Sequence, residues 1–254
     1  MWDFLNDKIK KYKIKEIGIA VPGTIKGTAI IKSVNLGVKN YNLVENLQKE
    51  INLPIKIRND AKCAALAENK YGALKKYNRI LFMTLGTGIG GAVIINGNLL
   101  ETGEYPGCEF GHMVIKENGL KCNCGRKGCF EKYGSMRAFK DNLRNELGLE
   151  DKTSGKELMA ILKDTTKESK DYAKIEKVRK QYIRDLSVGI ANLVNIFEPE
   201  AIGIGGSFVY FSEVLLQDVK KTILKEDMLF NPRKEINIQT AVLGNEAGII
   251  GATL

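Results

Sequence analysis

One histidine and three of the five cysteines lie close together in the segment GHMVIKENGLKCNCGRKGCFE. His112, Cys122, Cys124 and Cys129 would form a closed set of nitrogen and sulfur ligands. Such a set suits a structural zinc ion and leaves no position open for catalysis. The alternative is free thiols in a loop beside a hydrogen-bonding histidine. We predict zinc at 112–129, because the only histidine of the chain falls beside its only cysteine cluster.

Two glycine-rich turns could bind a phosphate. Leu85–Gly91 (LGTGIGG) and Ile202–Ser207 (IGIGGS) each follow an expected strand, and backbone amides at such turns can approach an anionic ligand closely. The first turn is neither a Rossmann fingerprint nor a P-loop, because a strand is expected to follow it and the Gly-Lys-Ser/Thr ending is missing. For each turn alone, a tight turn without a ligand is an equally good interpretation.

A carboxylate stands where an expected strand meets an expected helix, at Asn59-Asp60. Either side chain could cap the helix. A carboxylate at this position could also act as a general base toward a substrate hydroxyl. Taken by itself, the cap is the simpler interpretation. Two glutamates, Glu109 and Glu131, flank the cysteine segment, and glutamates at surfaces are common.

The elements that must position these residues alternate between strands and helices, which predicts an α/β fold. The first hundred residues alternate evenly and the rest is richer in helix, which predicts two lobes with a cleft between them. We expect an N-terminal lobe over 1–80 and a C-terminal lobe over 81–254, with the last helix able to return to the first lobe. The expected strands are 14–21, 55–58, 79–85, 92–95, 201–204 and 236–242; the expected helices are 2–11, 43–50, 59–72, 131–147, 171–197, one after residue 206 and one at the C-terminus.

Composition narrows the class of protein. No apolar run in the 254 residues is long enough to span a membrane and the N-terminus has no secretory signal, so we expect a cytoplasmic protein without a membrane partner. Cysteine clustering in such a chain favours a metal over disulfides. The net charge of +9 could attract anions. The lysines are dispersed and no nucleic-acid motif is present, so we expect no nucleic-acid partner.

Taken together, these motifs resemble the ROK family (repressor, open reading frame, kinase) of sugar kinases and sugar-responsive repressors. VPGTI (21–25) is similar to the family's Pro-Gly strand end, and NDAKCAALAE (59–68) to its catalytic Asn-Asp and helix. LGTGIGGAVIINGNLLETGEYPGCEFGHMVI (85–115) resembles its phosphate loop and sugar site, and CNCGRKGCFEKYGS (122–135) its zinc motif. The resemblance extends from about Glu16 to Leu254.

The resemblance implies a two-lobed, actin-like or hexokinase-like ATPase fold built on ribonuclease H-like motifs. It implies an ATP-dependent kinase for the 6-hydroxyl of a hexose or N-acetylhexosamine, with Mg²⁺ accompanying ATP, a structural zinc ion and a homodimer. Asp60 would be the catalytic base, and His112 would use one ring nitrogen for zinc and the other for sugar. The implied sugar ligands are Gly23, Asn35, Asn59, Asp60, Glu109, His112 and Glu131; the implied nucleotide ligands are Gly86, Thr87, Gly88, Gly90, Gly91, Gly205 and Gly206.

One departure limits this inference. The family begins with a strand and an Asp-x-Gly-Gly-Thr phosphate loop, and nothing in this sequence matches them. We therefore expect the N-terminal lobe to be truncated, through a start codon assigned too late, a gene fragment or a degenerate paralogue. The alternative function is a sugar-binding protein or regulator without catalysis.

Overall fold

The computed structural model describes residues 2–33, 36–101, 105, 107–225 and 228–254. The chain forms two compact units. Unit 1 comprises Met1–Asn78, Ala92–Cys108 and Val242–Leu254; unit 2 comprises Arg79–Gly91 and Glu109–Ala241. The predicted boundary between two domains at residue 80 stays a prediction. The compact units differ from it, because residues 92–108 and 242–254 belong to unit 1.

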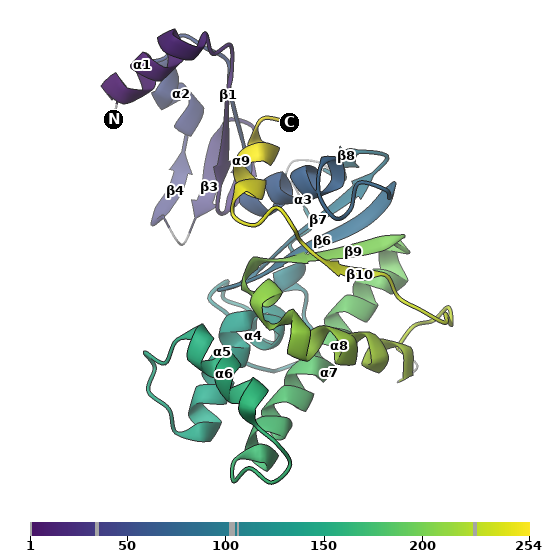
Figure 1. Ribbon diagram of the computed structural model, residues 1–254. Helices are drawn as coiled ribbons and strands as arrows, with labels where there is room; N and C mark the ends of the chain where they lie inside the picture. Colours follow the sequence, from purple (N-terminus) through teal and green to yellow (C-terminus); the bar gives the residue numbers. More distant parts are fainter. Residues whose placement is uncertain (1, 34–35, 102–104, 106, 226–227) are drawn as a thin grey trace. The chain divides into compact units, whose positions relative to one another are not determined.

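Unit 1 combines a parallel strand pair with a small antiparallel sheet. β1 pairs with β5 so that Val21 lies opposite Asn59, and the second sheet has the order β2-β3-β4. Helices α3 and α9 lie side by side (Figure 1). Gly251 allows this, because a Cβ there would lie 1.7 Å from the carbonyl oxygen of Cys63. The elements of this unit are α1 (Trp2–Tyr12), β1 (Ile17–Val21), β2 (Thr24–Lys26), β3 (Ala29–Ser33), β4 (Val38–Tyr41), α2 (Leu43–Gln48), β5 (Ile55–Asn59), α3 (Asp60–Lys70), β8 (Asn98–Leu99) and α9 (Glu246–Ala252).

The five-stranded sheet has the order β10-β9-β6-β7-β8, with β9 parallel to both β6 and β10. β7 belongs to unit 2 up to Gly91, and its last residues belong to unit 1. The hairpin between β7 and β8 turns at Asn96 and Gly97, both with positive φ, as the Asn-Gly pair predicts. The elements of unit 2 are β6 (Arg79–Leu85), β7 (Ile89–Ile95), η1 (Phe110–His112), α4 (Glu131–Gly134), α5 (Met136–Leu147), α6 (Gly155–Asp164), α7 (Tyr172–Phe197), β9 (Ala201–Gly205), η2 (Gly206–Phe211), α8 (Ser212–Lys225) and β10 (Ile238–Thr240).

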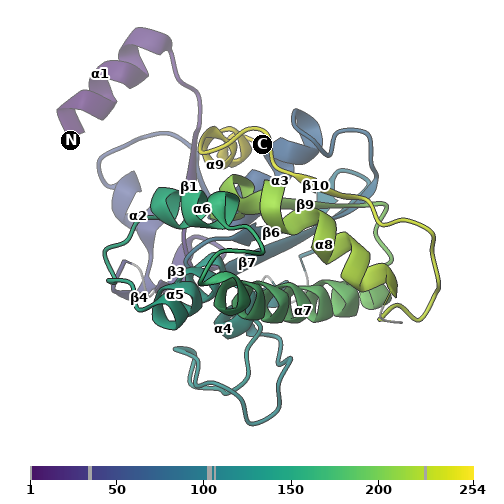
Figure 2. The same ribbon diagram turned by 60° about the horizontal axis from the view of Figure 1, so that its bottom comes forward.

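The 26-residue helix α7 organises the helical part of unit 2. It packs against α4, α5 and α8, and the last of these lies beside it in Figures 1 and 2. Phe130, fully buried, fits against α7 because Gly189 has no side chain; a Cβ there would lie 2.2 Å from the ring. Phe139 of α5 stacks at 4.6 Å on Tyr182 of α7. This packing fixes the residue that directly precedes α4.

Three parts of unit 1 and unit 2 differ from the sequence-based expectation. The helix expected over 131–147 is broken at Ser135, whose side chain instead caps α5 by accepting a hydrogen bond from the Ala138 amide at 3.2 Å. Strands β2 to β4 and helix α6 were not expected. No helix within the described ranges has the length and apolarity needed to cross a membrane.

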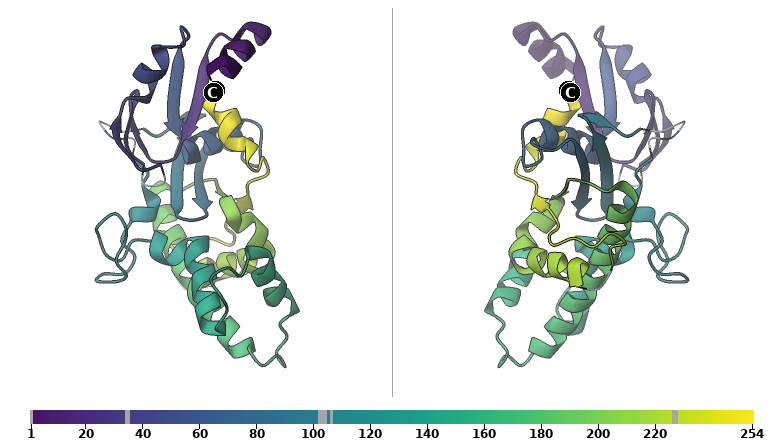
Figure 3. Two further views of the ribbon diagram at one scale, coloured as in Figure 1. Left: turned by 90° about the vertical axis from the view of Figure 1, so that its left-hand side faces the viewer. Right: turned by 90° about the vertical axis from the view of Figure 1, so that its right-hand side faces the viewer.

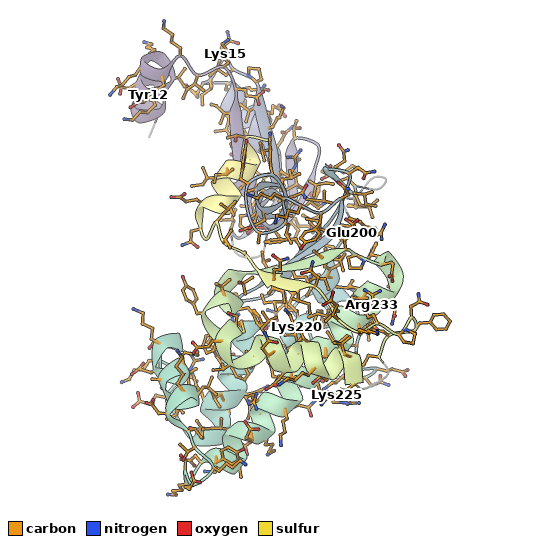
Figure 4. All side chains as sticks on the ribbon, turned by 45° about the vertical axis from the view of Figure 1, so that its right-hand side comes forward. Tyr12, Lys15, Glu200, Lys220, Lys225 and Arg233 are labelled. Atoms are coloured by element: carbon orange, nitrogen blue, oxygen red, sulfur yellow. The ribbon has the colours of Figure 1, made fainter. Side chains whose placement is uncertain are left out.

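The positive charge is dispersed over the elements of each unit. Lys15 follows α1 in unit 1, and Lys220 and Lys225 lie on α8 in unit 2 (Figure 4). Several basic side chains are paired locally; Arg233, also labelled there, binds the Glu198 carboxylate at 2.5 Å. This dispersion agrees with the expectation that the lysines lie on separate solvent-exposed faces and do not form one basic surface.

Candidate active site and metal centre

Of the pair Asn59 and Asp60, the structure shows which residue caps the helix. Asn59 is the N-cap of α3: its Oδ1 accepts a hydrogen bond from the Lys62 amide at 3.2 Å. Its Nδ2 donates to the carbonyl oxygen of Gly23 at 3.0 Å. Gly23 has φ of 119°, and a Cβ there would lie 2.4 Å from the Lys32 carbonyl oxygen. The amide of Asn59 thus ties the turn after β1 to the start of α3.

Because Asn59 supplies the cap, Asp60 is left as the first residue of the helix. Its Oδ1 accepts a hydrogen bond from the Ala61 amide at 2.9 Å. Burial raises the pKa of the Asp60 carboxyl, and this outweighs the hydrogen bonds that lower it. A carboxylate with a raised pKa accepts a proton more readily near neutral pH. Asn35, also predicted at the sugar site, lies outside the described residues.

The four predicted metal ligands converge in unit 2. The ligand atoms of His112, Cys122, Cys124 and Cys129 all lie within 4.8 Å of one another. His112 Nδ1 is 3.8 Å from Cys122 Sγ, and Cys124 Sγ is 3.6 Å from Cys129 Sγ. This arrangement of one nitrogen and three sulfurs fits a tetrahedral zinc ion.

The loop that carries these ligands is shaped by tight turns. The Cys122 amide donates to the Arg126 carbonyl at 2.8 Å, and the Gly125 amide to the Cys122 carbonyl at 3.0 Å. Gly125 and Gly128 both have positive φ, and a Cβ at Gly128 would lie 1.8 Å from the Lys116 carbonyl oxygen. Figures 2 and 3 show the segment before α4 as an irregular loop that projects from the helices of its unit. We call residues 112–129 the metal hairpin.

The thiols of the metal hairpin differ in acidity. Burial acts to raise the pKa of the Cys124 thiol, and hydrogen bonds from Arg126 and neighbouring cysteines bring it down to about 6. Burial raises the pKa of Cys129 to about 12, together with its hydrogen bonds to the other two cysteines. Thiolate is the form that binds metal.

The two glycine-rich turns lie next to each other. β6 and β9 are adjacent and parallel, with Thr84 opposite Gly205, so both turns stand at carboxyl ends of neighbouring strands. Gly206 has φ of 73°, and a Cβ there would lie 2.7 Å from the Leu85 carbonyl oxygen. Gly91 faces Phe110, whose ring would be 2.1 Å from an added Cβ. Gly90 and Gly91 are strand residues of β7, so the turn itself consists of residues 86–88.

Glu109 and Glu131 have different surroundings. Glu109 precedes η1, is exposed, and its side chain makes no hydrogen bond or ion pair among the described residues. Glu131 begins α4, and its Oε2 accepts a hydrogen bond from the Ile89 amide at 3.1 Å. Glu131 therefore contacts the end of the glycine turn. The sequence does not indicate this contact, because the two residues are 42 positions apart.

Contacts of Lys116 and Leu120 link the metal hairpin to α7 and α4, and these contacts were not predicted. Lys116 Nζ lies 2.7 Å from the buried Asp185 carboxylate of α7 and 4.4 Å from the centre of the Tyr133 ring. Tyr133 Oη accepts a hydrogen bond from the Leu120 amide at 2.6 Å. No sequence pattern indicates these contacts, because a lysine in a loop and an aspartate in a helix are both ordinary surface residues.

Known proteins are similar to this chain in sequence and in fold. The chain is 33% identical over 249 residues to a glucokinase of Halalkalibacterium halodurans, covering 92% of this chain and 74% of the relative. It is 31% identical to a xylose repressor of Bacillus spizizenii, over 84% of this chain and 53% of that protein. The structure of a Streptomyces griseus ROK glucokinase in complex with glucose and AMPPNP matches with a TM-score of 0.80 at 25% identity, covering 99% of this chain and 85% of that one.

The α/β fold predicted from the sequence is confirmed by the last match, which is consistent with an actin-like ATPase fold. The family profile matches residues 2–254, nearly the whole sequence. The predicted resemblance is thereby confirmed as well, and the chain belongs to the ROK family.

Proposed function

We propose that this chain is an ATP-dependent kinase that phosphorylates the 6-hydroxyl of a hexose, either glucose or an N-acetylhexosamine such as N-acetylmannosamine. The observation that carries the proposal is Asp60: an exposed carboxylate at the start of α3 whose pKa is raised by partial desolvation, and which is not needed as the helix cap because Asn59 supplies it. Glucokinases among the relatives support the reaction class.

The proposed chemistry is a single phosphoryl transfer. The sugar oxygen forms a bond to the γ-phosphorus, the bond from that phosphorus to the ADP oxygen breaks, and Asp60 takes the hydroxyl proton. Such transfer depends mainly on positioning and on electrostatic stabilisation. Gly23, Asn59, Glu109, His112 and Glu131 are the proposed sugar ligands. Residues 86–88 and Gly205-Gly206 are the proposed contacts to ATP and its Mg²⁺.

Zinc fits the donor set of the metal hairpin. His112, Cys122, Cys124 and Cys129 would hold it, and a closed set of four ligands would give it a structural role. Glu131 follows Cys129 by two residues, so an ion at this position would fix where α4 begins. We also propose a homodimer, which light scattering at two protein concentrations would test.

The reaction is tested by incubating the chain with ATP, Mg²⁺ and either glucose or N-acetylmannosamine, and measuring ADP release and sugar phosphate. We expect turnover with one of these sugars, and a fall of about 10²- to 10⁴-fold in kcat for Asp60→Asn. Asp151→Asn, at an exposed carboxylate, is the matched control. Wild-type protein that consumes no ATP with either sugar would contradict the proposal.

The second candidate is a sugar-binding protein without catalysis, favoured by the xylose repressors among the relatives. Calorimetric titration with each sugar, with and without ATP, separates the two functions. Sugar binding without nucleotide binding would support this candidate, whereas binding of both favours the kinase.

A further inference from the structure

The Glu131 carboxylate lies in contact with a turn that is far from it in sequence. Its Oε2 accepts a hydrogen bond from the Ile89 amide at 3.1 Å. Its Oε1 makes no hydrogen bond among the described residues. One oxygen therefore holds the turn, and the other is available to a ligand.

The turn is shaped to receive this carboxylate. A Cβ at Gly88 would lie 2.2 Å from Glu131 Oε2 and 3.0 Å from its Cδ, far closer than atoms pack. A second contact follows six residues along, where the Arg137 amide of α5 donates to the Gly86 carbonyl oxygen at 3.0 Å. Glu131 and Arg137 thus form hydrogen bonds with the residues on either side of Gly88, and the absence of a side chain at Gly88 leaves the space that the Glu131 carboxylate occupies.

We propose that the turn 86–88, together with the Ile89 amide that follows it, positions the Glu131 carboxylate for sugar binding, so that Gly88 determines sugar affinity although it belongs to the nucleotide turn. This inference rests on the proposed function, in which Glu131 binds the sugar. It also implies that sugar and nucleotide affinities are coupled, because a ligand that shifts the turn shifts a sugar ligand too, and such coupling is reciprocal.

Two glycine-to-alanine substitutions in unit 2 form a matched pair. In Gly88→Ala the new methyl must displace the end of the flexible Glu131 side chain, so the fold should persist while the carboxylate moves. In Gly155→Ala, at the start of α6 and outside the proposed binding sites, the nearest atom to the new methyl lies at 3.8 Å, an ordinary contact. Neither glycine has a positive φ, so neither substitution strains the backbone. The two variants therefore differ in what they do to Glu131.

The measurement is calorimetric titration of the full chain with glucose, and with N-acetylmannosamine as the second probe, without nucleotide. Because a charge-assisted hydrogen bond is among the stronger polar contacts, we expect Gly88→Ala to weaken sugar binding about 10-fold or more. Gly155→Ala should keep the wild-type affinity. Circular dichroism of both variants checks that they are folded.

A double-mutant cycle tests whether the effect passes through Glu131. In a Glu131→Gln background the positioned carboxylate is already lost, so Gly88→Ala should cost little further affinity. Equal sugar affinity for wild type and Gly88→Ala would overturn the inference, and so would full additivity in the cycle. If wild-type protein binds neither sugar, the proposed function fails first, which is a different result.

Discussion

The Asp60 carboxyl is exposed at the start of α3, yet neighbouring atoms partly desolvate it. This desolvation raises its pKa above the ordinary 3.8, against the hydrogen bond from the Ala61 amide. A raised pKa in the folded state favours the protonated form, so this residue's stabilising contribution is complete below the unfolded pKa. That contribution is lost as the pH rises through the folded pKa. At neutral pH the ionised carboxylate therefore adds no such stability, and because the residue is exposed the effect should be small.

Asp60→Asn removes that charge and keeps an oxygen to accept the Ala61 amide. We expect its melting temperature at pH 7 to equal or exceed that of the wild type, and the difference to shrink as the pH falls below about 4, where both side chains are neutral. For the wild type, kcat/KM should fall on the acid side as Asp60 is protonated. Thermal melts and rate profiles across pH check both statements. A variant clearly less stable than wild type at neutral pH would show that the carboxylate supports the fold.

Part of the candidate site can be predicted from single residues. The sequence indicates the importance of Asn59 and Asp60, because an Asn-Asp pair between a strand and a helix is typical of a helix cap or a general base. The pair alone does not tell which of the two is the cap; that depends on the turn at Gly23, whose carbonyl oxygen accepts a hydrogen bond from Asn59. The contact of Glu131 with Ile89 could not be predicted, because nothing local to either residue indicates it.

The metal hairpin is the element on which a bound ion would act. Its four ligand atoms lie within 4.8 Å of one another and two of the cysteines are buried. Removal of zinc by a chelator should lower the melting temperature and weaken sugar binding, since His112 begins the hairpin and Glu131 follows its last residue by two positions. Inductively coupled plasma mass spectrometry measures the metal content, and isothermal titration calorimetry measures the sugar affinity.

The cysteines provide the control for that experiment. Cys124→Ser removes a ligand and should abolish stoichiometric zinc, whereas Cys63→Ala changes a buried thiol of α3 outside the hairpin and should retain it. Unchanged sugar affinity after complete zinc removal would break the link between ion and sugar, even with the metal present in the wild type.

The metal hairpin is also fastened to α7 by an ion pair. Lys116 Nζ contacts the Asp185 carboxylate at 2.7 Å, and the Asp185 side chain is only 8% exposed. Lys116→Met would remove the ion pair from this buried carboxylate, which also accepts a hydrogen bond from Gln181 Nε2 at 3.0 Å. Breaking a buried pair costs about 3–5 kcal/mol; with Lys116 partly exposed, we expect about 2–3 kcal/mol from urea denaturation.

Lys177→Met is the matched control for the ion pair. Lys177 also pairs with a carboxylate, that of Glu146 at 2.9 Å, but its own side chain is 71% exposed. Exposed pairs contribute about 0–1 kcal/mol, so this variant should be nearly as stable as the wild type. Equal losses in the two variants would mean that burial of Asp185 does not decide the cost.

Elements with a strong local signal were predicted well, and those defined by distant contacts were not. β6 occupies Arg79–Leu85, the range expected from its apolar run. Helix α6 was missed although Ser154 and Glu157 form a capping box, a local signal that could have found it. The break at Ser135 has a different origin. Phe130 packs between Gly134 and Gly189 there, and this tertiary packing leaves no trace in helix periodicity.

The chain passes between the two units four times, so unit 1 is assembled from three separate segments. Its C-terminal segment begins at Val242 and ends in α9, which packs on α3 and β1. Alternation of strands and helices predicts the fold class, but it does not predict which segments join one unit. That depends on pairings such as the approach of Gly251 to Cys63, which only the folded chain reveals.

Glu68 secures the start of this returning segment. It is fully buried on α3, where Oε1 accepts hydrogen bonds from the Val242 and Leu243 amides, both at 2.8 Å, and Oε2 accepts one from Ala73 at 2.9 Å. Glu68→Gln keeps the shape but replaces one accepting oxygen with an NH₂ group, which leaves at least one of these part-buried amides without its acceptor. An unsatisfied buried donor costs about 1–3 kcal/mol, so we expect a loss toward the lower end of that range.

We therefore expect Glu68→Gln to lower the urea midpoint and to speed hydrogen exchange in α9, because residues 242–243 connect that helix to the rest of the chain. Glu50→Gln, at an exposed glutamate just after α2, should change neither. Exchange in α5 of unit 2 provides an internal reference, since opening limited to the anchored segment leaves it unchanged. Faster exchange in both units alike would mean that Glu68 supports global stability and has no particular role in holding the C-terminal segment.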